Sequence, residues 1–283
     1  MGAGRIIIHG GFFSEADTSD AVKKAKQNAL SDITKKSYEF LQNHSALQTA
    51  VHAVELLEDC DLFNAGTGSQ IQRDGKIRMS ASLMDGASLK FSGVINIEDV
   101  KNPICVAERL LKADDRVLAG EGALQFARAN GFQFFNTETA SRRKEYEAKT
   151  SIKGLGTVGC VALDKDGKLA AATSTGGKGF EIPGRVSDSA TVAGNYANAV
   201  CGVSCTGVGE DIVSGAVAIK IVTRVTDGQS LKEACEITFG ELKPFNGFAG
   251  AIAIDIAGNL FHIDSHPSMV FASFDGVKIE MFK

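Results

Sequence analysis

The chain has 283 residues, of which 44% are hydrophobic and 23% are charged, and its formal net charge at pH 7 is -4. This length holds one large domain or two small ones with a substantial core, and the composition is ordinary for a globular protein in water. The slight acidity gives no basic surface for nucleic acid or an anionic membrane, so neither partner is expected.

The N-terminal segment lacks the features of a targeting signal. Its short apolar run has no basic flank and no small-residue cleavage site, and Ile6 stands where N-myristoylation requires Ser or Thr. The six cysteines include no C-x-x-C pair and are interpreted as reduced, buried thiols. These features predict a cytoplasmic protein.

The first half of the chain mixes strand and helix patterns. Residues 5–8 form an expected strand that ends in a turn at residues 9–11. The other elements expected in this half are helices over 18–41, 47–57, 103–111 and 120–129 and strands over 77–84 and 88–97. Residues 136–154 are the most polar stretch and are expected to form an exposed, weakly anchored connector.

The second half is richer in strand patterns. Strands over 157–163 and 169–175 flank Asp166-Gly167 as a β-hairpin. Further strands are expected over 199–205, 248–255, 259–264 and 269–282, and helices over 209–225 and 230–242. Strands that cluster and join by hairpins, with helices in pairs, favour mostly antiparallel sheets faced by helices, which is an α+β sandwich.

Six sequence blocks together resemble one enzyme family. The longest is GTVGCVALDKDGKLAAATSTGG at residues 156–177, and the others are HGG at 9–11, FNAG at 63–66, LMDG at 83–86, GRVSDS at 184–189 and CTGVGE at 205–210. In this order, along nearly the whole chain, they resemble the plant-type L-asparaginase and isoaspartyl peptidase family of N-terminal-nucleophile hydrolases.

The resemblance implies a fold and a maturation step. The fold is an αββα four-layer sandwich in which residues 1–283 form a single domain. The chain is expected to cleave itself into an α chain of residues 1–156 and a β chain of residues 157–283, with an exposed linker at about 136–156.

Thr157 is the predicted nucleophile and Gly156-Thr157 the predicted cleavage site. A threonine freed at its N-terminus carries an α-amine beside its hydroxyl, and that amine, with a reference pKa of about 7.7 to 8.0, is a suitable general base. A glycine before the cleaved bond leaves its carbonyl open to the hydroxyl because it has no Cβ.

The resemblance also implies roles for other residues. Thr175 orients the nucleophile, and Thr206 with Gly207 forms the oxyanion hole, where a hydroxyl and a backbone N–H stabilise the tetrahedral intermediate. The substrate-binding residues implied are Arg185 for the α-carboxylate, Asp188 for the α-amine, Gly209 for a backbone contact and Asn64 in the lining.

Two nucleotide-site motifs are weaker interpretations of these glycine-rich turns. Gly207 and Gly209 begin a G-x-G-x-x-G pattern, but Ile212 replaces the third glycine. Lys178 follows two glycines as in a P-loop, but Gly179 stands where Ser or Thr is required.

No cofactor is expected for catalysis. His262 and His266 have the i, i+4 spacing of a helical metal pair, but the surrounding sequence alternates like a strand, which would separate them. The resemblance implies one structural sodium ion held by the backbone carbonyls of Leu57, Glu58, Cys60, Phe63 and Ala65.

The function expected is hydrolysis of β-aspartyl dipeptides and L-asparagine, with release of L-aspartate, by a homodimer of cleaved αβ units. Two alternatives remain at this point: a glycosylasparaginase-like hydrolase, and an uncleaved, non-catalytic homologue that acts as a binding protein. The presence of Thr157, Thr175, Arg185, Asp188 and Thr206 argues against the second alternative.

Overall fold

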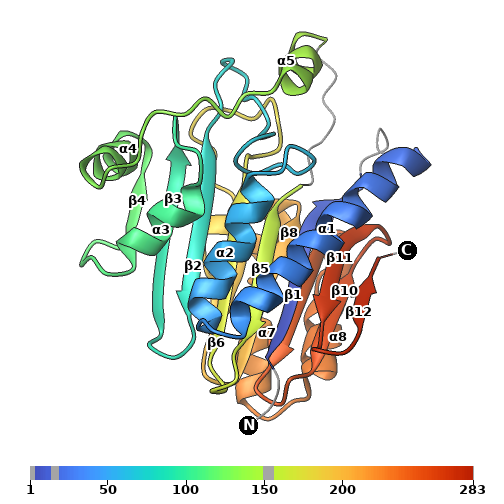
Figure 1. Ribbon diagram of the computed structural model, residues 1–283. Coiled ribbons are helices and arrows are strands. Elements are labelled where there is room, and N and C mark those ends of the chain that lie inside the picture. Colours follow the sequence, from blue (N-terminus) through green and yellow to red (C-terminus); the bar gives the residue numbers. More distant parts are fainter. Residues whose placement is uncertain (1–3, 14–18, 149–155, 283) are drawn as a thin grey trace.

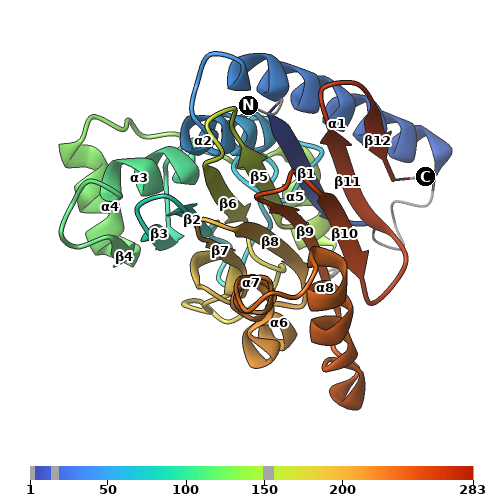
Figure 2. The same ribbon diagram turned by 90° about the horizontal axis from the view of Figure 1, so that it is seen from below.

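Two β-sheets lie face to face and carry helices on their outer sides (Figures 1 and 2). The computed structural model describes residues 4–13, 19–148 and 156–282. Within these residues an 8-stranded sheet has the order β12-β11-β1-β5-β6-β2-β3-β4, and a 4-stranded sheet has the order β10-β9-β8-β7. The described neighbours pair antiparallel except β3 and β4, which are parallel. The predicted α+β sandwich with an αββα layer order is confirmed.

The large sheet consists of β1 (Arg5–Phe12), β2 (Met79–Asp85), β3 (Lys90–Ile97), β4 (Val117–Ala119), β5 (Val158–Leu163), β6 (Leu169–Thr175), β11 (Met269–Phe274) and β12 (Ile279–Met281). The small sheet consists of β7 (Asn195–Ala197), β8 (Cys201–Gly207), β9 (Ala249–Asp255) and β10 (Leu260–Asp264).

Helices cover both outer faces. The outer face of the large sheet packs against α1 (Asp20–Leu41), α2 (Ala46–Glu58) and α3 (Pro103–Leu110), and α4 (Gly120–Ala129) packs beside β3 and β4. The small sheet packs against α7 (Val217–Thr226) and α8 (Leu231–Gly240), while the short α6 (Gly209–Gly215) follows β8 directly. Every described helix is too short or too polar to cross a bilayer.

The two sheets approach closely where β5 meets β8. All positions of β5 and β6 are buried, because helices cover one face of these strands and the small sheet covers the other. A Cβ added at Gly202 would lie 2.9 Å from Cγ1 of Val161, so a glycine is needed at this contact. The register Val158↔Ser174 sets the start of β5 beside the end of β6.

Several elements differ from the sequence-based prediction. β1 continues through the expected turn at residues 9–11, because a bulge between His9 and Phe12, with Gly11 at φ 88°, keeps it paired with β11. The expected helix over 209–225 breaks into α6 and α7 at Ala216, which is left-handed at φ 48°. The expected strand over 269–282 is the hairpin β11–β12, and the short strands β4 and β7 were not predicted.

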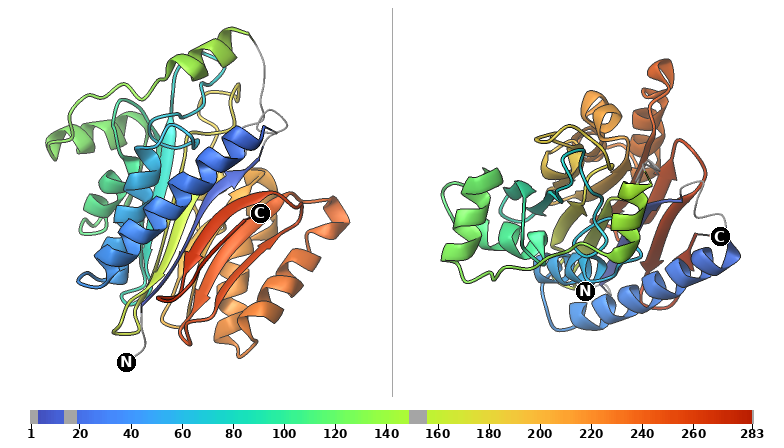
Figure 3. Two further views of the ribbon diagram at one scale, coloured as in Figure 1. Left: turned by 45° about the vertical axis from the view of Figure 1, so that its right-hand side comes forward. Right: turned by 90° about the horizontal axis from the view of Figure 1, so that it is seen from above.

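The polar stretch before Thr157 contains a helix rather than only a loose connector. α5 (Ala140–Glu147) lies over one end of the sandwich, apart from both sheets (Figures 1 and 3). Thr139 caps it by accepting from the backbone of Arg142, and Tyr146 stacks on Phe180 with ring centroids 5.1 Å apart. Residues 149–155 of the predicted linker lie outside the described residues.

Candidate active site

Thr157 lies directly before β5, at the end of the sandwich where β6 ends in Thr175. The Thr157 side chain is 7% exposed, and its Oγ1 donates to Oγ1 of Thr175 at 3.2 Å. Thr175 Oγ1 in turn accepts from the backbone N–H of Gly177 at 3.2 Å. The predicted nucleophile and its predicted orienting hydroxyl are therefore in contact.

A buried chain of hydrogen bonds holds the backbone of Thr157 from beneath. Nδ1 of His9 lies 2.9 Å from the Thr157 carbonyl oxygen, so Nδ1 carries the proton, because a carbonyl can only accept. Nε2 then accepts from the Ser204 hydroxyl at 2.9 Å, and Ser204 accepts from Thr173 at 2.6 Å. A Cβ at Gly159 would lie 2.0 Å from Ser204 Oγ, so a side chain there would disrupt the chain.

Burial keeps this imidazole neutral. His9 is fully buried, and desolvation lowers its pKa to about 3, against an opposing contribution from the bond to Thr157. The sequence interpretation placed His9 in a turn and gave it no role. The period-2 spacing of Thr173 and Thr175, which puts both side chains on one face of β6, was the available signal for the network.

The predicted oxyanion residues lie at the end of β8. Thr206 follows Ser204 by two residues, so its side chain points from β8 toward the large sheet, as that of Ser204 does. Thr206 is fully buried, and its Oγ1 has no hydrogen-bond partner among the described residues. Gly207 has φ 133°, and a Cβ there would lie 2.5 Å from the Phe248 carbonyl oxygen. A buried hydroxyl without a partner costs free energy unless a ligand uses it.

Asn64 lies beside Gly156 and bonds to the turn after β6. Its Nδ2 donates to the Gly177 carbonyl at 2.5 Å, and its Oδ1 accepts from the backbone of Gln70 at 2.9 Å. A Cβ at Gly156 would lie 2.6 Å from the Asn64 Cβ. Glycine is therefore the residue that fits between Asn64 and Thr157.

Arg185 and Asp188 meet at Gly209, the first residue of α6. A Cβ at Gly209 would lie 2.8 Å from Asp188 Oδ1 and 2.9 Å from Arg185 Nη2. Asp188 is 2% exposed, and its Oδ2 has no partner among the described residues. Arg185 pairs with Glu210, which the sequence interpretation did not assign, through Nε and Nη2 at 2.8 Å each.

This pairing leaves one edge of the guanidinium for a ligand. Glu210 occupies the Nε and Nη2 edge of Arg185, so the Nη1 and Nη2 edge remains as a second bidentate fork. The Arg185 hydrogen bonds lower the pKa of Glu210 to about 2. Burial raises the pKa of Asp188 to about 7, and the nearby Arg185 only partly opposes this effect. A positively charged ligand group would relieve the cost of ionising Asp188.

Backbone carbonyls of α2 and the loop after it pack closely against two glycines of that loop. Gly66 and Gly68 have φ of 51° and 98°; a Cβ at Gly66 would lie 2.4 Å from the Glu58 oxygen, and a Cβ at Gly68 would lie 2.8 Å from the oxygens of both Asp61 and Phe63. These close approaches require glycine at both positions, and the Glu58 carbonyl also accepts from the backbone N–H of Thr67 at 2.7 Å. Glu58 and Phe63 belong to the predicted ligand set, and Asp61 does not.

The two histidines with metal-like spacing stack on different aromatic rings. His262, on β10, stacks on Phe271 with centroids 3.7 Å apart, whereas His266, beyond that strand, stacks on Phe248 at 4.5 Å. The strand expected from the alternating pattern is confirmed.

Comparison with known proteins agrees with this geometry. The family model described as "Asparaginase" matches residues 3–282. An isoaspartyl peptidase/L-asparaginase of Nostoc sp. is 43% identical, over 97% of this chain and 93% of that protein. An isoaspartyl peptidase of Escherichia coli is 39% identical, over 92% of this chain and 89% of that protein. A plant-type L-asparaginase of Pyrococcus horikoshii is 34% identical, over 94% of this chain and 95% of that protein. The chain therefore belongs to the asparaginase family of N-terminal-nucleophile hydrolases.

Proposed function

We propose that this protein is a self-processing threonine amidohydrolase that hydrolyses β-aspartyl dipeptides and L-asparagine and releases L-aspartate. The observation that carries the proposal is the position of Thr157, which follows Gly156 directly and donates from Oγ1 to Thr175 at 3.2 Å. Relatives named for these two activities support the substrate class.

Maturation uses the same hydroxyl as catalysis. Oγ1 of Thr157 attacks the carbonyl carbon of Gly156, the peptide C–N bond breaks, and an ester forms while the Thr157 nitrogen becomes a free amine. Water then hydrolyses the ester. The products are a chain that ends in the Gly156 carboxylate and a chain that begins with the Thr157 amine.

In the mature enzyme that amine accepts the Oγ1 proton as Thr157 attacks the side-chain carbonyl of the substrate. The hydroxyl of Thr206 and the N–H of Gly207 stabilise the oxyanion of the tetrahedral intermediate. The leaving group, ammonia or an amino acid, takes the proton, and water releases L-aspartate from the acyl-enzyme. The neutral His9 holds the Thr157 carbonyl in place throughout.

Arg185 and Asp188 define which amide is cut. The free edge of Arg185 holds the α-carboxylate, and Asp188 holds the α-ammonium group, with Gly209 permitting both to approach. With both α groups held, only the side-chain carbonyl of an aspartyl group faces Thr157. We also propose that sodium binds the loop after α2, where it would stabilise the segment that carries Asn64, and that the cleaved αβ units form a homodimer.

Two measurements test the function. The wild-type protein should split into two fragments by intact mass, the smaller beginning TVGCV, whereas Thr157→Ala should remain at full length. The cleaved enzyme should hydrolyse β-Asp-Leu at least about 100-fold faster than α-Asp-Leu, because the α-linked isomer leaves the site's polar groups unpaired. Comparable rates on the two isomers would refute the assignment of Arg185 and Asp188.

A further inference from the structure

A cavity of about 520 Å³ lies behind the segment that carries Arg185. It is lined by residues just before β2, by the end of β3, by the end of β4 and the first turns of α4, and by residues of the 183–186 segment. Within the described chain, none of the residues assigned above to catalysis or substrate binding lines it. Its volume falls within the range of about 300 to 1,000 Å³ typical of small-molecule sites.

The charges in this cavity balance. Lys76 and Arg78 contribute positive charge, and Glu98 and Glu121 contribute negative charge. Arg78 is already paired with Glu98 at 2.8 Å and with Asp74 at 2.9 Å, so Lys76 and Glu121 are the lining charges that face a ligand. Lys76 is 58% exposed and shares one contact, to Glu98 at 3.3 Å, so its ammonium retains donors for a ligand carboxylate. Glu121 is exposed and can accept from a ligand ammonium group. Such a lining favours a zwitterion over a simple anion or cation.

The remaining wall is apolar. Ile95, Leu124 and Val186 line the cavity, and Val186 is 52% exposed although it is a large hydrophobic residue. Burying such surface against an apolar side chain of a ligand is favourable, because it removes apolar area from water. Charge balance and apolar wall together fit an α-amino acid with an aliphatic side chain.

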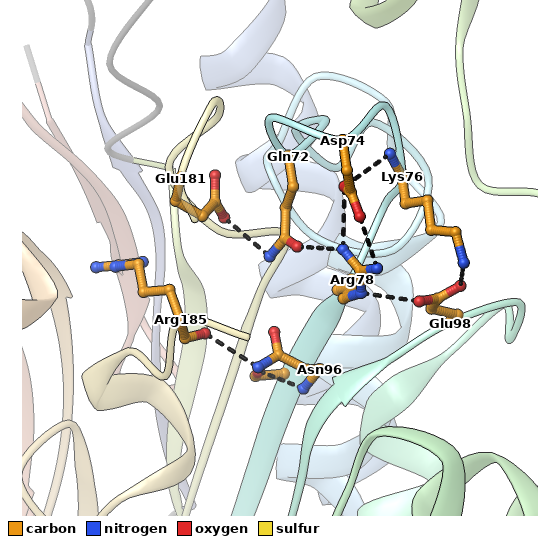
Figure 4. Close-up of polar contacts among 9 residues, drawn as sticks. Gln72, Asp74, Lys76, Arg78, Asn96, Glu98, Glu181 and Arg185 are labelled. Atoms are coloured by element: carbon orange, nitrogen blue, oxygen red, sulfur yellow. Dashed lines mark hydrogen bonds and ion pairs between the residues drawn. The ribbon is translucent and has the colours of Figure 1, made fainter. Parts of the chain in front are cut away.

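The cavity and the catalytic cluster share one wall. The Arg185 side chain points toward Glu210 and Asp188, while its neighbours Gly184 and Val186 line the cavity on the other side. Asn96, which also lines the cavity, donates from Nδ2 to the Arg185 carbonyl at 3.1 Å (Figure 4). A ligand against Asn96 would therefore contact the backbone support of Arg185.

A second set of hydrogen bonds runs from the cavity to the same segment. Arg78 donates to Oε1 of Gln72 at 2.6 Å, and Nε2 of Gln72 donates to Glu181 at 3.4 Å (Figure 4). Glu181 is 4% exposed and also accepts from the backbone of Lys178 at 3.3 Å. Hydrogen bonds thus connect residues of the cavity to Glu181 and to the Arg185 carbonyl.

We propose that this cavity is a second binding site for a free α-amino acid with an aliphatic side chain, and that its occupancy favours the position of Arg185 that binds substrate. A ligand that contacts Val186 and Asn96 in this arrangement stabilises the arrangement itself. The source of the ligand rests on the proposed function, because hydrolysis of a β-aspartyl dipeptide releases such an amino acid.

Calorimetry with L-leucine as the probe tests the site. Titration into the wild-type protein saturated with L-aspartate should show one leucine per chain, because aspartate occupies the catalytic cluster. N-acetyl-leucine and leucinamide, which each lack one charge of the zwitterion, should bind at least about tenfold more weakly. This measurement does not require activity, so it stands even if the proposed reaction is wrong.

Two tryptophan variants, one in the cavity just before α4 and one at the far end of α4, locate the binding site. Ala119→Trp places a large side chain in the cavity and should weaken leucine binding at least about tenfold. Ala129→Trp changes an exposed residue at the far end of α4 and should leave binding unchanged. Absence of leucine binding to the wild type, or equal binding by the two tryptophan variants, would overturn the site.

Kinetics test the link to Arg185. With L-asparagine as substrate, saturating leucine should lower KM by a factor of about five and leave kcat unchanged. Asn96 has φ 52°, so Asn96→Gly keeps the backbone conformation while it removes the bond to Arg185. This variant retains Lys76, Glu121 and Val186 in the lining, so it should still bind leucine, but it should lose the effect on KM. An unchanged KM in the wild type with leucine bound would overturn the link.

Discussion

The imidazole of His9 and the carbonyl of Thr157 form a hydrogen bond of 2.9 Å between residues 148 positions apart in the sequence. The bond fixes the backbone of the nucleophile from the interior, on the side opposite the cleaved peptide bond. Because His9 is neutral and its Nε2 accepts from Ser204, the ring is fixed in the tautomer that carries its proton on Nδ1. The position of the nucleophile therefore depends on a residue far from the linker.

Two substitutions of His9 separate this bond from general packing. Asn carries an amide nitrogen close to the position of Nδ1, so His9→Asn should retain the bond to Thr157, whereas His9→Ala should lose it. We expect His9→Ala to slow self-cleavage at least about tenfold, the effect of losing one charge-neutral hydrogen bond at a buried site. Self-cleavage is measured by intact mass over time, and equal rates in the two variants would count against the positioning role.

Gly156→Ala should slow self-cleavage by steric conflict. The added Cβ would lie 2.6 Å from the Asn64 Cβ, so either Asn64 or the cleaved bond must move. A displacement of this size disturbs the attack geometry and should cost about 100-fold in rate. Gly122→Ala is the control, because a Cβ at Gly122 meets nothing within 4 Å. Normal cleavage by Gly156→Ala would show that the contact with Asn64 is not required.

Local patterns predicted the elements and the chemical groups better than their pairings. The β5–β6 hairpin follows from Asp166-Gly167 and the flanking apolar runs, and the sequence blocks marked Thr157, Thr175 and Thr206. The chain from His9 to Ser204 was not predicted, because its members are 195 residues apart and nothing in the neighbourhood of either indicates the other.

The sequence also did not predict the partner of Arg185 or the helix in the linker. The sequence assigned Arg185 to a substrate carboxylate and did not indicate Glu210, which the fold brings from the start of α6 to the guanidinium. α5 was missed because it buries no apolar face and gains its anchors from side chains such as Tyr146. Polar composition predicts exposure, and exposure does not exclude a helix.

Thr206→Ala should remove the hydroxyl of the proposed oxyanion hole. In enzyme that has already cleaved itself, kcat should fall about 100 to 1,000-fold while KM changes little, because the hydroxyl acts on the intermediate more than on the substrate. Thr206→Ser retains the hydroxyl and should keep most of the activity. A normal kcat in Thr206→Ala would show that other donors form the hole.

Affinity for the product L-aspartate should rise as the pH passes through about 7, the pKa to which burial raises Asp188. Below this pH the free carboxyl is protonated and does not attract the α-ammonium group; above it, the carboxylate binds the group. Affinity should therefore fall about tenfold for each pH unit below the pKa. Calorimetry between pH 5.5 and about 8 tests this, since the charges of aspartate itself are constant there. Asp188→Asn should bind weakly and show no such dependence.

Gly209→Ala should weaken substrate binding without changing the chemical step. Its Cβ would lie 2.8 Å from Asp188 Oδ1 and 2.9 Å from Arg185 Nη2, so the two groups proposed to hold the α-amine and α-carboxylate must separate. Because Thr157, Thr175 and Thr206 are untouched, KM for β-Asp-Leu should rise about tenfold while kcat stays within about twofold of the wild type. Gly240→Ala is the matched control, since a Cβ at the end of α8 meets nothing within 4 Å. An unchanged KM in Gly209→Ala would place the substrate's α groups elsewhere, whereas a lost kcat with normal KM would make this turn part of the oxyanion hole.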